Sequence, residues 1–273
     1  MSFPPPYLSR RDALQGAAAF LGATLMPIPF KAASNDSLAD APETWLKTTR
    51  YIDTDHPTIA KTARRLTASA STDLAKTQAL FYFVRDEIKF GFARGFWDNR
   101  ASEVLSAGVG YCNTKSTLFV ALLRASGIPA RQVFVDIHAS VLNGIIDPGT
   151  PYVDHSYVEV LLDGAWIATD AYIVDAALFR PAQARVLEEG QLMGYGVHAT
   201  GTLAWRPPTA AFSQFNKLDP RPISTRHWGV FEDVGAFYQQ ADAPWNRLNA
   251  LLREAFGLAA RSANRRAEQI RAA

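Results

Sequence analysis

The chain has 273 residues, a formal net charge of +2 and a single cysteine. Apolar residues make up 48% of it and aromatic residues 11%, which is enough for a buried core and excludes wholesale disorder. The small net charge argues against a nucleic-acid-binding surface. One cysteine excludes an internal disulfide and a cysteine-rich zinc site. We therefore expect neither nucleic acid nor a metal as ligand.

The first 41 residues have the pattern of an export signal. Ser9-Arg10-Arg11 precedes the moderately apolar residues 13–26, and adjacent arginines before a short apolar run are typical of a bacterial twin-arginine signal. The run is shorter than the ~20 residues that cross a bilayer, so no integral membrane segment is expected in the mature chain. The prediction is an exported, periplasmic protein; the alternative is a cytoplasmic protein with an unstructured N-terminus.

Two helices are predicted in the next part of the chain. Residues 71–73, with the sequence Ser-Thr-Asp, form a typical helix start, and the apolar positions that follow are spaced by three and four up to residue 88. Residues 91–110 have the composition of a loop. A second helix is predicted over residues 113–126, because Gly127 follows it as a typical helix end.

A strand, a long loop and a hairpin come next. Residues 131–137 favour a strand, and a loop is expected from residue 139 to residue 154; long loops in compact domains are often functional. Asp163-Gly164 is a typical two-residue turn between strands at residues 156–162 and 165–170. This order of elements predicts an α+β fold, with helices packed on an antiparallel sheet.

The last third of the chain carries weaker signals. Residues 181–192 favour a helix, and an amphipathic helix is predicted over residues 245–259. Residues 194–235 contain four prolines and are expected to be irregular.

Cys112 lies directly before the second predicted helix, after Gly108 and Gly110, which leave room for a substrate to approach. The unpaired N–H groups and the dipole of a helix N-terminus stabilise an anion, so we expect a lowered pKa for this thiol; the thiolate is the nucleophilic form. The alternative is a small buried apolar residue, which is the usual fate of a free cysteine. Position alone favours neither reading.

The predicted hairpin supplies a base and a carboxylate for the thiol. With Asp163-Gly164 as the turn, Tyr157 pairs with Asp170, and His155 points to the same face as Tyr157 because side chains alternate along a strand. His155 and Asp170 are then diagonal neighbours within reach of a side-chain hydrogen bond. Asp170 would hold the imidazole and His155 would serve the thiol, as nucleophilic catalysis requires.

Three segments together resemble the transglutaminase-like superfamily, and more narrowly its bacterial members. They are Gly110–Ser116 with its continuation into Gly-Ile-Pro-Ala-Arg at residues 127–131, the strand His155–Val160, and Trp166 followed by Asp170. The resemblance covers about residues 71–175. Each segment alone is weakly specific, but the combination, in this order and at this spacing, is specific.

The resemblance implies a papain-like arrangement with Cys112 as nucleophile, His155 as base and Asp170 as the residue that orients the base. The family includes protein cross-linking enzymes, cysteine peptidases, peptide N-glycanases and inactive members, and the active ones act on acyl or amide groups through a thioester. Asn113 stands where animal transglutaminases usually carry Trp, so hydrolysis is slightly favoured over acyl transfer to amines. The alternative is a non-catalytic protein-binding module.

The resemblance also implies two donors for the oxyanion: the backbone N–H of Cys112 and an upstream aromatic residue, for which Trp97 is the candidate. Trp97 could instead be a core or loop anchor. Thiol, imidazole and carboxylate suffice for the chemistry, so no cofactor is expected, and the expected substrate is a protein or peptide.

The chain is thus predicted to consist of a signal and linker (1–41), a transglutaminase-like catalytic domain (42–194) and a mostly helical C-terminal extension packed on the core (195–273). The extension either covers the sheet and the cleft or binds a partner.

Overall fold

The computed structural model describes residues 41–215, 224–240 and 250–273. The predicted signal lies outside these residues, as does the predicted start of the last helix at residues 245–249. No helix within the described ranges is both long and apolar enough to cross a membrane.

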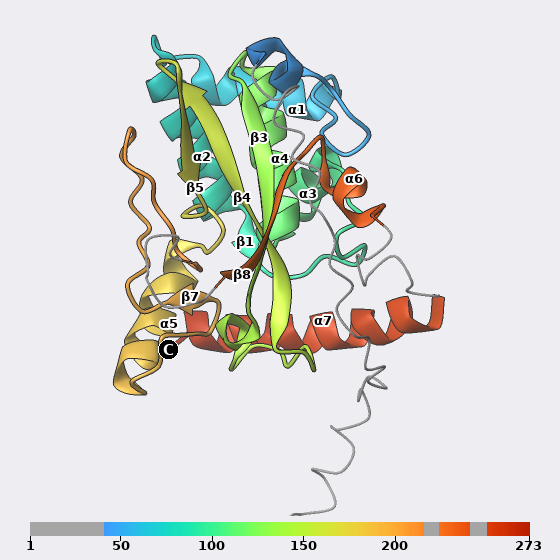
Figure 1. Cartoon of the computed structure of the whole chain (residues 1–273), viewed down its shortest axis with the longest axis vertical. Coiled ribbons are helices and arrows are strands. Elements are labelled where there is room, and N and C mark those ends of the chain that lie inside the picture. The colour runs from blue at the N-terminus through green and yellow to red at the C-terminus, as the bar shows by residue number, and fades with distance from the viewer. Residues whose placement is uncertain (1–40, 216–223, 241–249) are drawn as a thin grey trace, which may run out of the picture.

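One antiparallel sheet forms the centre of the molecule (Figure 1). Across it lie, in order, β5 (Ala165–Thr169), β4 (Tyr152–Leu162), β3 (Ala130–His138) and β8 (Ser224–Phe231). Two short pairs lie outside it: β1 (Lys89–Phe90) runs parallel to β2 (Val109–Gly110), and β6 (Met193–Gly194) runs antiparallel to β7 (Val197–His198).

Helices cover one face of the sheet and its lower end (Figure 1). The predicted α+β class, with helices on an antiparallel sheet, is confirmed. The helices are η2 (Pro42–Leu46), α1 (Pro57–Thr67), α2 (Asp73–Glu87), α3 (Ala101–Ala107), α4 (Cys112–Ala125), η3 (Ala139–Leu142), α5 (Ala176–Glu188), α6 (Val234–Tyr238) and α7 (Ala250–Arg271).

The two helices predicted first begin and end close to the expected residues. The Thr72 hydroxyl accepts a hydrogen bond from the N–H of Ala75 at 3.1 Å, so it caps α2 as the Ser-Thr-Asp start predicts. Helix α4 is buried on all sides from Cys112 to Arg124, not along one face. It packs between β4 and helices α1, α2 and α3, and this central position fixes its first residue, Cys112.

The predicted register of the hairpin is confirmed. Leu162 pairs with Ala165 and Val158 with Thr169. Asp163 and Gly164 both have positive φ, 50° and 78°, which is the geometry of the tight turn that such a pair favours. β4 starts at Tyr152 rather than at residue 156, because every residue of β3 pairs with a residue of β4 between 152 and 160. The predicted loop therefore ends before residue 152, and residues 152–154 belong to the strand.

Three other expectations are wrong. The region 91–110 contains α3, whose N-terminus is closed by a hydrogen bond between the N–H of Arg100 and Glu103 Oε2 at 2.7 Å. The helix expected from residue 181 starts at Ala176, after the cap Asp175, and carries Pro181 inside it. The region 194–235 contains β8, and its pairing with β3 has two register shifts, so its side chains do not alternate as a regular strand's would.

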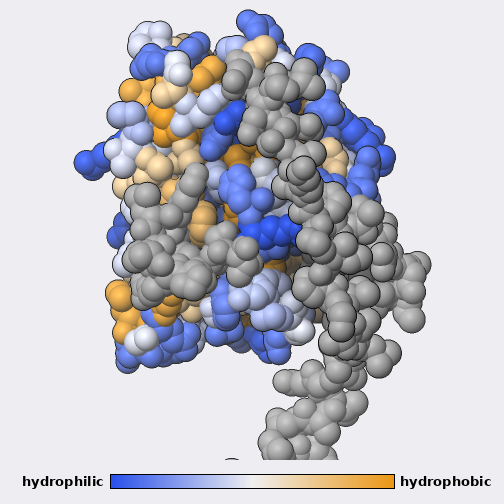
Figure 2. Space-filling model, in the orientation of Figure 1, coloured by the Kyte–Doolittle hydropathy of each residue, from blue (hydrophilic) through white to orange (hydrophobic). Residues whose placement is uncertain are grey.

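The arginine of the Gly-Ile-Pro-Ala-Arg segment links three strands of the sheet. Arg131 on β3 pairs with Glu159 on β4 at 2.8 Å, and its guanidinium lies 4.1 Å from the ring centroid of Trp166 on β5. On the face shown in Figure 2, hydrophilic side chains lie over apolar ones in the middle of the molecule. The sheet is therefore tied together at its surface, while its other face packs on α4.

Candidate active site

Cys112 is the first residue of α4, next to the short strand pair β1–β2. The N–H of Tyr111, which precedes it, donates to Thr114 Oγ1 at 3.0 Å and closes the first turn. A Cβ at Gly110 would lie 2.8 Å from Thr114 Oγ1 and 2.9 Å from Lys115 Cγ. Gly110 therefore serves close packing against α4, and not the open approach expected from the sequence.

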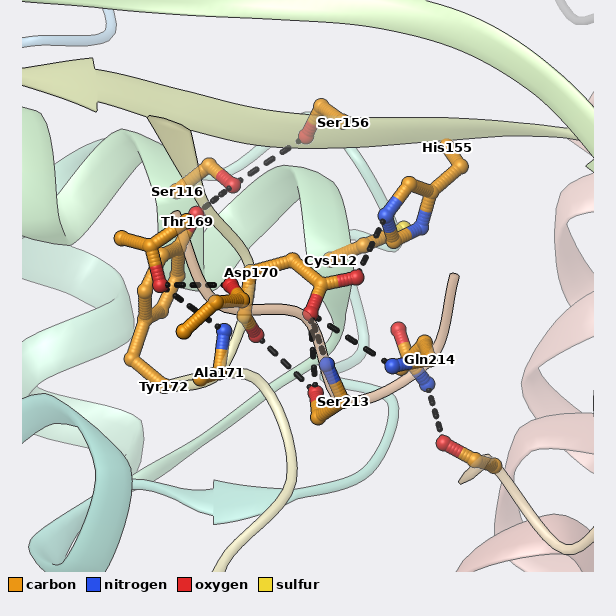
Figure 3. Close-up of polar contacts among 12 residues, drawn as sticks. Cys112, Ser116, His155, Ser156, Thr169, Asp170, Ala171, Tyr172, Ser213 and Gln214 are labelled. Carbon is orange, nitrogen blue, oxygen red and sulfur yellow. Dashed lines mark hydrogen bonds and ion pairs between the residues drawn. The ribbon is translucent and has the colours of Figure 1, made fainter. Parts of the chain in front are cut away.

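The structure brings together His155 and Asp170, as the hairpin register predicts. His155 Nε2 lies 3.2 Å from Asp170 Oδ2, and the two side chains are 1% and 0% exposed (Figure 3). Asp170 also accepts hydrogen bonds from the Ser213 hydroxyl at 3.1 Å and from the backbone N–H groups of Ser213 and Gln214. These donors fix the carboxylate, and through it the imidazole ring.

The Cys112 thiol lies against the strand that carries His155. The backbone N–H of Ser156, the next residue, donates toward the sulfur, and in the view of Figure 3 the Cys112 side chain overlaps the imidazole ring of His155. Cys112 is 7% exposed, and its thiol donates to Asn113 Oδ1 at 3.6 Å. His155 Nε2 faces Asp170, so Nδ1 is the ring atom left for the thiol.

Burial raises the pKa of the Cys112 thiol above its ordinary range, and the carboxylate of Asp154 adds to this. Backbone hydrogen bonds from Ser156 and Asn113 act in the opposite direction, and Asp170 raises the pKa further. The prediction that the helix N-terminus lowers the pKa of this thiol is therefore wrong for the resting protein. Burial destabilises the thiolate more than the helix N-terminus stabilises it.

A second polar cluster adjoins the thiol on the side of Asn113. Asn113 Nδ2 donates to Asp154 Oδ2 at 2.7 Å and to the Tyr238 hydroxyl at 2.8 Å, and that hydroxyl donates to Asp154 Oδ2 at 2.7 Å. The sequence patterns described above do not predict this cluster. Asp154 and Asn113 could have been found because each adjoins a predicted site residue, but Tyr238, 125 residues from Asn113, has no local signal.

Trp97 contacts this cluster through the ring of Tyr238. Its indole stacks on Tyr238 with centroids 4.5 Å apart and lies 6.1 Å from the ring of Tyr51. Tyr238 and Asn113 therefore stand between Trp97 and Cys112 in this series of contacts, which suits the anchor reading; its role as an oxyanion donor stays a prediction. Within the described part of the chain, no three His, Cys, Asp or Glu side chains group to hold a metal ion.

A thiol at the start of a helix, packed on an antiparallel sheet that bears a His–Asp pair, defines the papain-like class of fold. Residues 60–171 match the family model described as the transglutaminase-like superfamily. The match includes Cys112, His155 and Asp170, and it agrees with the resemblance that the sequence motifs indicate.

The individual proteins that resemble this chain are only distantly similar to it. A protein of Haemophilus influenzae, described as uncharacterized, is 25% identical over 195 residues, covering 65% of this chain and 52% of that protein. The chain thus spans about half the length of this relative.

Two solved structures share part of the fold. One, from Cytophaga hutchinsonii, is provisionally described as a cysteine protease; it has a TM-score of 0.38 and 21% identity, over 45% of this chain and 39% of that chain. The other is the periplasmic domain of TgpA from Pseudomonas aeruginosa bound to ethylmercury, with a TM-score of 0.35 and 23% identity, over 49% and 50% of the two chains. We draw no activity from these likenesses.

Proposed function

We propose that the protein is a cysteine-dependent enzyme that acts on amide or peptide bonds of a protein or peptide substrate. The observation that carries the proposal is the buried contact of His155 Nε2 with Asp170 Oδ2 at 3.2 Å, beside a thiol held at the start of α4. A fixed carboxylate, an oriented imidazole and an adjacent thiol are the parts that nucleophilic acyl chemistry needs.

In this mechanism the resting thiol is protonated and His155 acts as a general base. The thiol proton passes to Nδ1 as the sulfur attacks the substrate carbonyl, and Asp170 stabilises the resulting imidazolium. The imidazolium returns the proton to the leaving amine, which leaves an acyl thioester on Cys112. Water, or an amine, then releases the acyl group. We slightly favour water, because Asn113 stands where animal transglutaminases usually carry Trp.

Three groups are candidates to stabilise the oxyanion. The backbone N–H of Cys112 lies at the start of α4, where no carbonyl of a preceding turn is available to it. Trp97 remains the candidate proposed from the sequence. The hydroxyl of Tyr111 is a third, since it is buried near Asn113 and Tyr238 and makes only weak hydrogen bonds to them.

We also propose that residues 195–273 belong to the same folded unit as the site. β8 completes the sheet, Ser213 holds Asp170 and Tyr238 contacts Asn113. For location, we propose export to the periplasm, on the basis of Ser9-Arg10-Arg11 and the apolar run after it.

The test is trapping of acyl groups on the single thiol. The wild-type protein and a Cys112→Ala variant are incubated with cell extract, and intact and peptide masses are compared. We expect acyl adducts on Cys112 that the variant lacks. A glutamine-containing protein with a labelled amine then separates the two reactions, because incorporation of label indicates transfer and release of ammonia or peptide alone indicates hydrolysis.

One observation favours the alternative of a non-catalytic protein-binding module. Burial raises the pKa of the Cys112 thiol, as it does for an inert cysteine. If this alternative is right, extract proteins bind equally to wild type and to Cys112→Ala, and no adduct forms.

A further inference from the structure

The orientation of the Asn113 amide is fixed by its neighbours. The Asp154 carboxylate can only accept hydrogen bonds, so the amide group 2.7 Å from it must be the NH2. The Tyr238 hydroxyl gives its proton to Asp154 and therefore accepts from the same NH2. The carbonyl oxygen of Asn113 is thereby turned toward Cys112.

This orientation gives the thiol proton an acceptor other than the catalytic base. Cys112 Sγ lies 3.6 Å from Asn113 Oδ1, and a thiol can donate to a carbonyl oxygen whereas a thiolate can only be repelled by it. The backbone of Asn113 is held as well, because its carbonyl accepts from Gln132 Nε2 at 3.1 Å and from the Thr117 hydroxyl at 2.9 Å. The side chain is held by the two hydrogen bonds of its NH2 group, to Asp154 and to Tyr238, and so cannot easily turn away.

We propose that Asn113, Asp154 and Tyr238 form a positioning network that holds the Cys112 thiol in its protonated form and away from His155 until substrate binds. This inference rests on the proposed function only in taking Cys112 as the nucleophile. Activation then needs the S–H bond to turn from Asn113 Oδ1 to His155 Nδ1. There the bond breaks, the proton stays on the ring nitrogen and the electron pair stays on sulfur.

The charges around the sulfur support this assignment. Among the described residues, the titratable groups that face it are Asp154 and His155 on β4, Asp170 after β5, Tyr238 on α6 and Tyr111 before α4. Burial raises the pKa of both tyrosines, so they are neutral near pH 7. Asp154 is thus the negative group whose removal should most favour the thiolate.

The S–H stretching vibration in the Raman spectrum tests the hydrogen bond directly, because the chain has one cysteine. At pH 7 the full-length protein should show one S–H band, at the lowered frequency of a donating thiol. In Asn113→Ala the band should move to the frequency of a free thiol or one that donates to imidazole. An absent band at pH 7, or an unmoved band in the variant, would overturn the proposal.

The alkylation rate of Cys112 by iodoacetamide tests the role of Asp154 and does not depend on Asn113→Ala being folded. Asp154→Asn keeps an acceptor oxygen and removes the charge, so at pH 7.5 we expect alkylation at least about tenfold faster, the factor that a one-unit fall in thiol pKa produces. The pH at which the S–H band disappears should fall by about one unit in a variant whose midpoint of urea denaturation matches that of wild type, since loosening would also expose the thiol and lower its pKa.

The matched control is Glu159→Gln. It removes a carboxylate from the same strand, paired with Arg131 at 2.8 Å and not with the thiol cluster, so its rate should stay within about twofold of wild type. Equal rates in wild type and Asp154→Asn would contradict the proposal. Neither measurement uses a substrate: if both succeed and no acyl-Cys112 is ever trapped, the network stands and the proposed function fails.

Discussion

Two buried carboxylates near the first turn of α4 are stabilised in different ways. Asp175 accepts two hydrogen bonds from Arg271, at 2.6 and 3.0 Å, and one from the N–H of Phe90 at 2.9 Å. Burial alone would raise the pKa of Asp175, but the guanidinium of Arg271 lowers it below its ordinary value. Asp170 instead accepts from His155, Ser213 and Gln214, whose hydrogen-bonding groups include no permanent cation.

The difference separates a structural cluster from a reactive one. A permanent cation stabilises a buried carboxylate and fastens the end of α7 to the core, but it changes nothing during a reaction. Dipolar donors hold a carboxylate in place and leave its charge to act on a neighbouring imidazole. We call the first the Arg271 cluster (Arg271, Asp175, Phe90) and the second the Asp170 cluster (Asp170, His155, Ser213, Gln214).

The largest effect on stability is expected from Arg271→Met. The ion pair is buried, with the side chains of Arg271 and Asp175 8% and 5% exposed. The variant leaves the Asp175 carboxylate buried without its cation and should lose about 3–5 kcal/mol in free energy of unfolding. Urea denaturation measures this. The double variant Arg271→Met/Asp175→Asn should recover part of the loss; a loss under ~1 kcal/mol in the single variant would mean that the cluster is not structural.

Ser213→Ala should affect the Asp170 cluster less. The variant removes one hydrogen bond to a fully buried carboxylate, which typically costs about 1–3 kcal/mol. It should also slow acylation of Cys112, because the imidazole loses part of its support. The control is Ser140→Ala, whose hydroxyl forms a hydrogen bond with the exposed His138 and which should change stability by less than ~0.5 kcal/mol. Equal effects in the two variants would remove Ser213 from the account.

The two clusters also differ in how far the sequence predicts them. The contact of His155 with Asp170 follows from the Asp163-Gly164 turn, because a two-residue turn fixes which residues pair. The helix start next to Cys112 follows from the apolar run after it and from Gly127, which marks the helix end. Both signals are local in the sequence, and both survive in the structure.

The rest of the site depends on contacts that no local pattern records. Ser213 lies 43 residues from Asp170, and Arg271 lies 96 residues from Asp175. The sequence does not predict β8, because the two register shifts in its pairing with β3 disturb the alternation of a regular strand. The raised pKa of Cys112 was missed for a similar reason: burial comes from the packing of α4 among other elements, and the helix N-terminus alone predicts the opposite sign.

Lys115, one turn after Cys112, gives a test that varies with pH. Its ammonium group is fully buried and donates to the carbonyl of Ile88, and burial lowers its pKa to about 7. Above pH 7 the folded protein has released this proton, while the unfolded chain still binds it up to about pH 10.5, so the lysine costs less stability as pH rises.

We therefore expect wild type to gain about 2 kcal/mol relative to Lys115→Met between pH 7 and pH 9, by urea denaturation at each pH. A difference that stays constant over this range would show that Lys115 keeps its ordinary pKa.

The smallest effect is expected at the exposed rim of the Arg271 cluster. Lys89 and Glu268 are 3.3 Å apart but 57% and 55% exposed. Because water and salt screen such a pair, Lys89→Ala should change the free energy of unfolding by less than ~0.5 kcal/mol. A loss comparable to that of Arg271→Met would show that burial does not separate structural from incidental ion pairs here.

The central claim is that Cys112, His155 and Asp170 act as one chemical unit. Acylation by p-nitrophenyl acetate tests it most directly, with nitrophenolate release followed over one turnover and the acetyl group located by peptide mass. We expect acetyl-Cys112 in wild type, none in Cys112→Ala, and acylation at least about 100-fold slower in His155→Ala. Acetylation of Cys112 at the same rate in wild type and His155→Ala would contradict the claim.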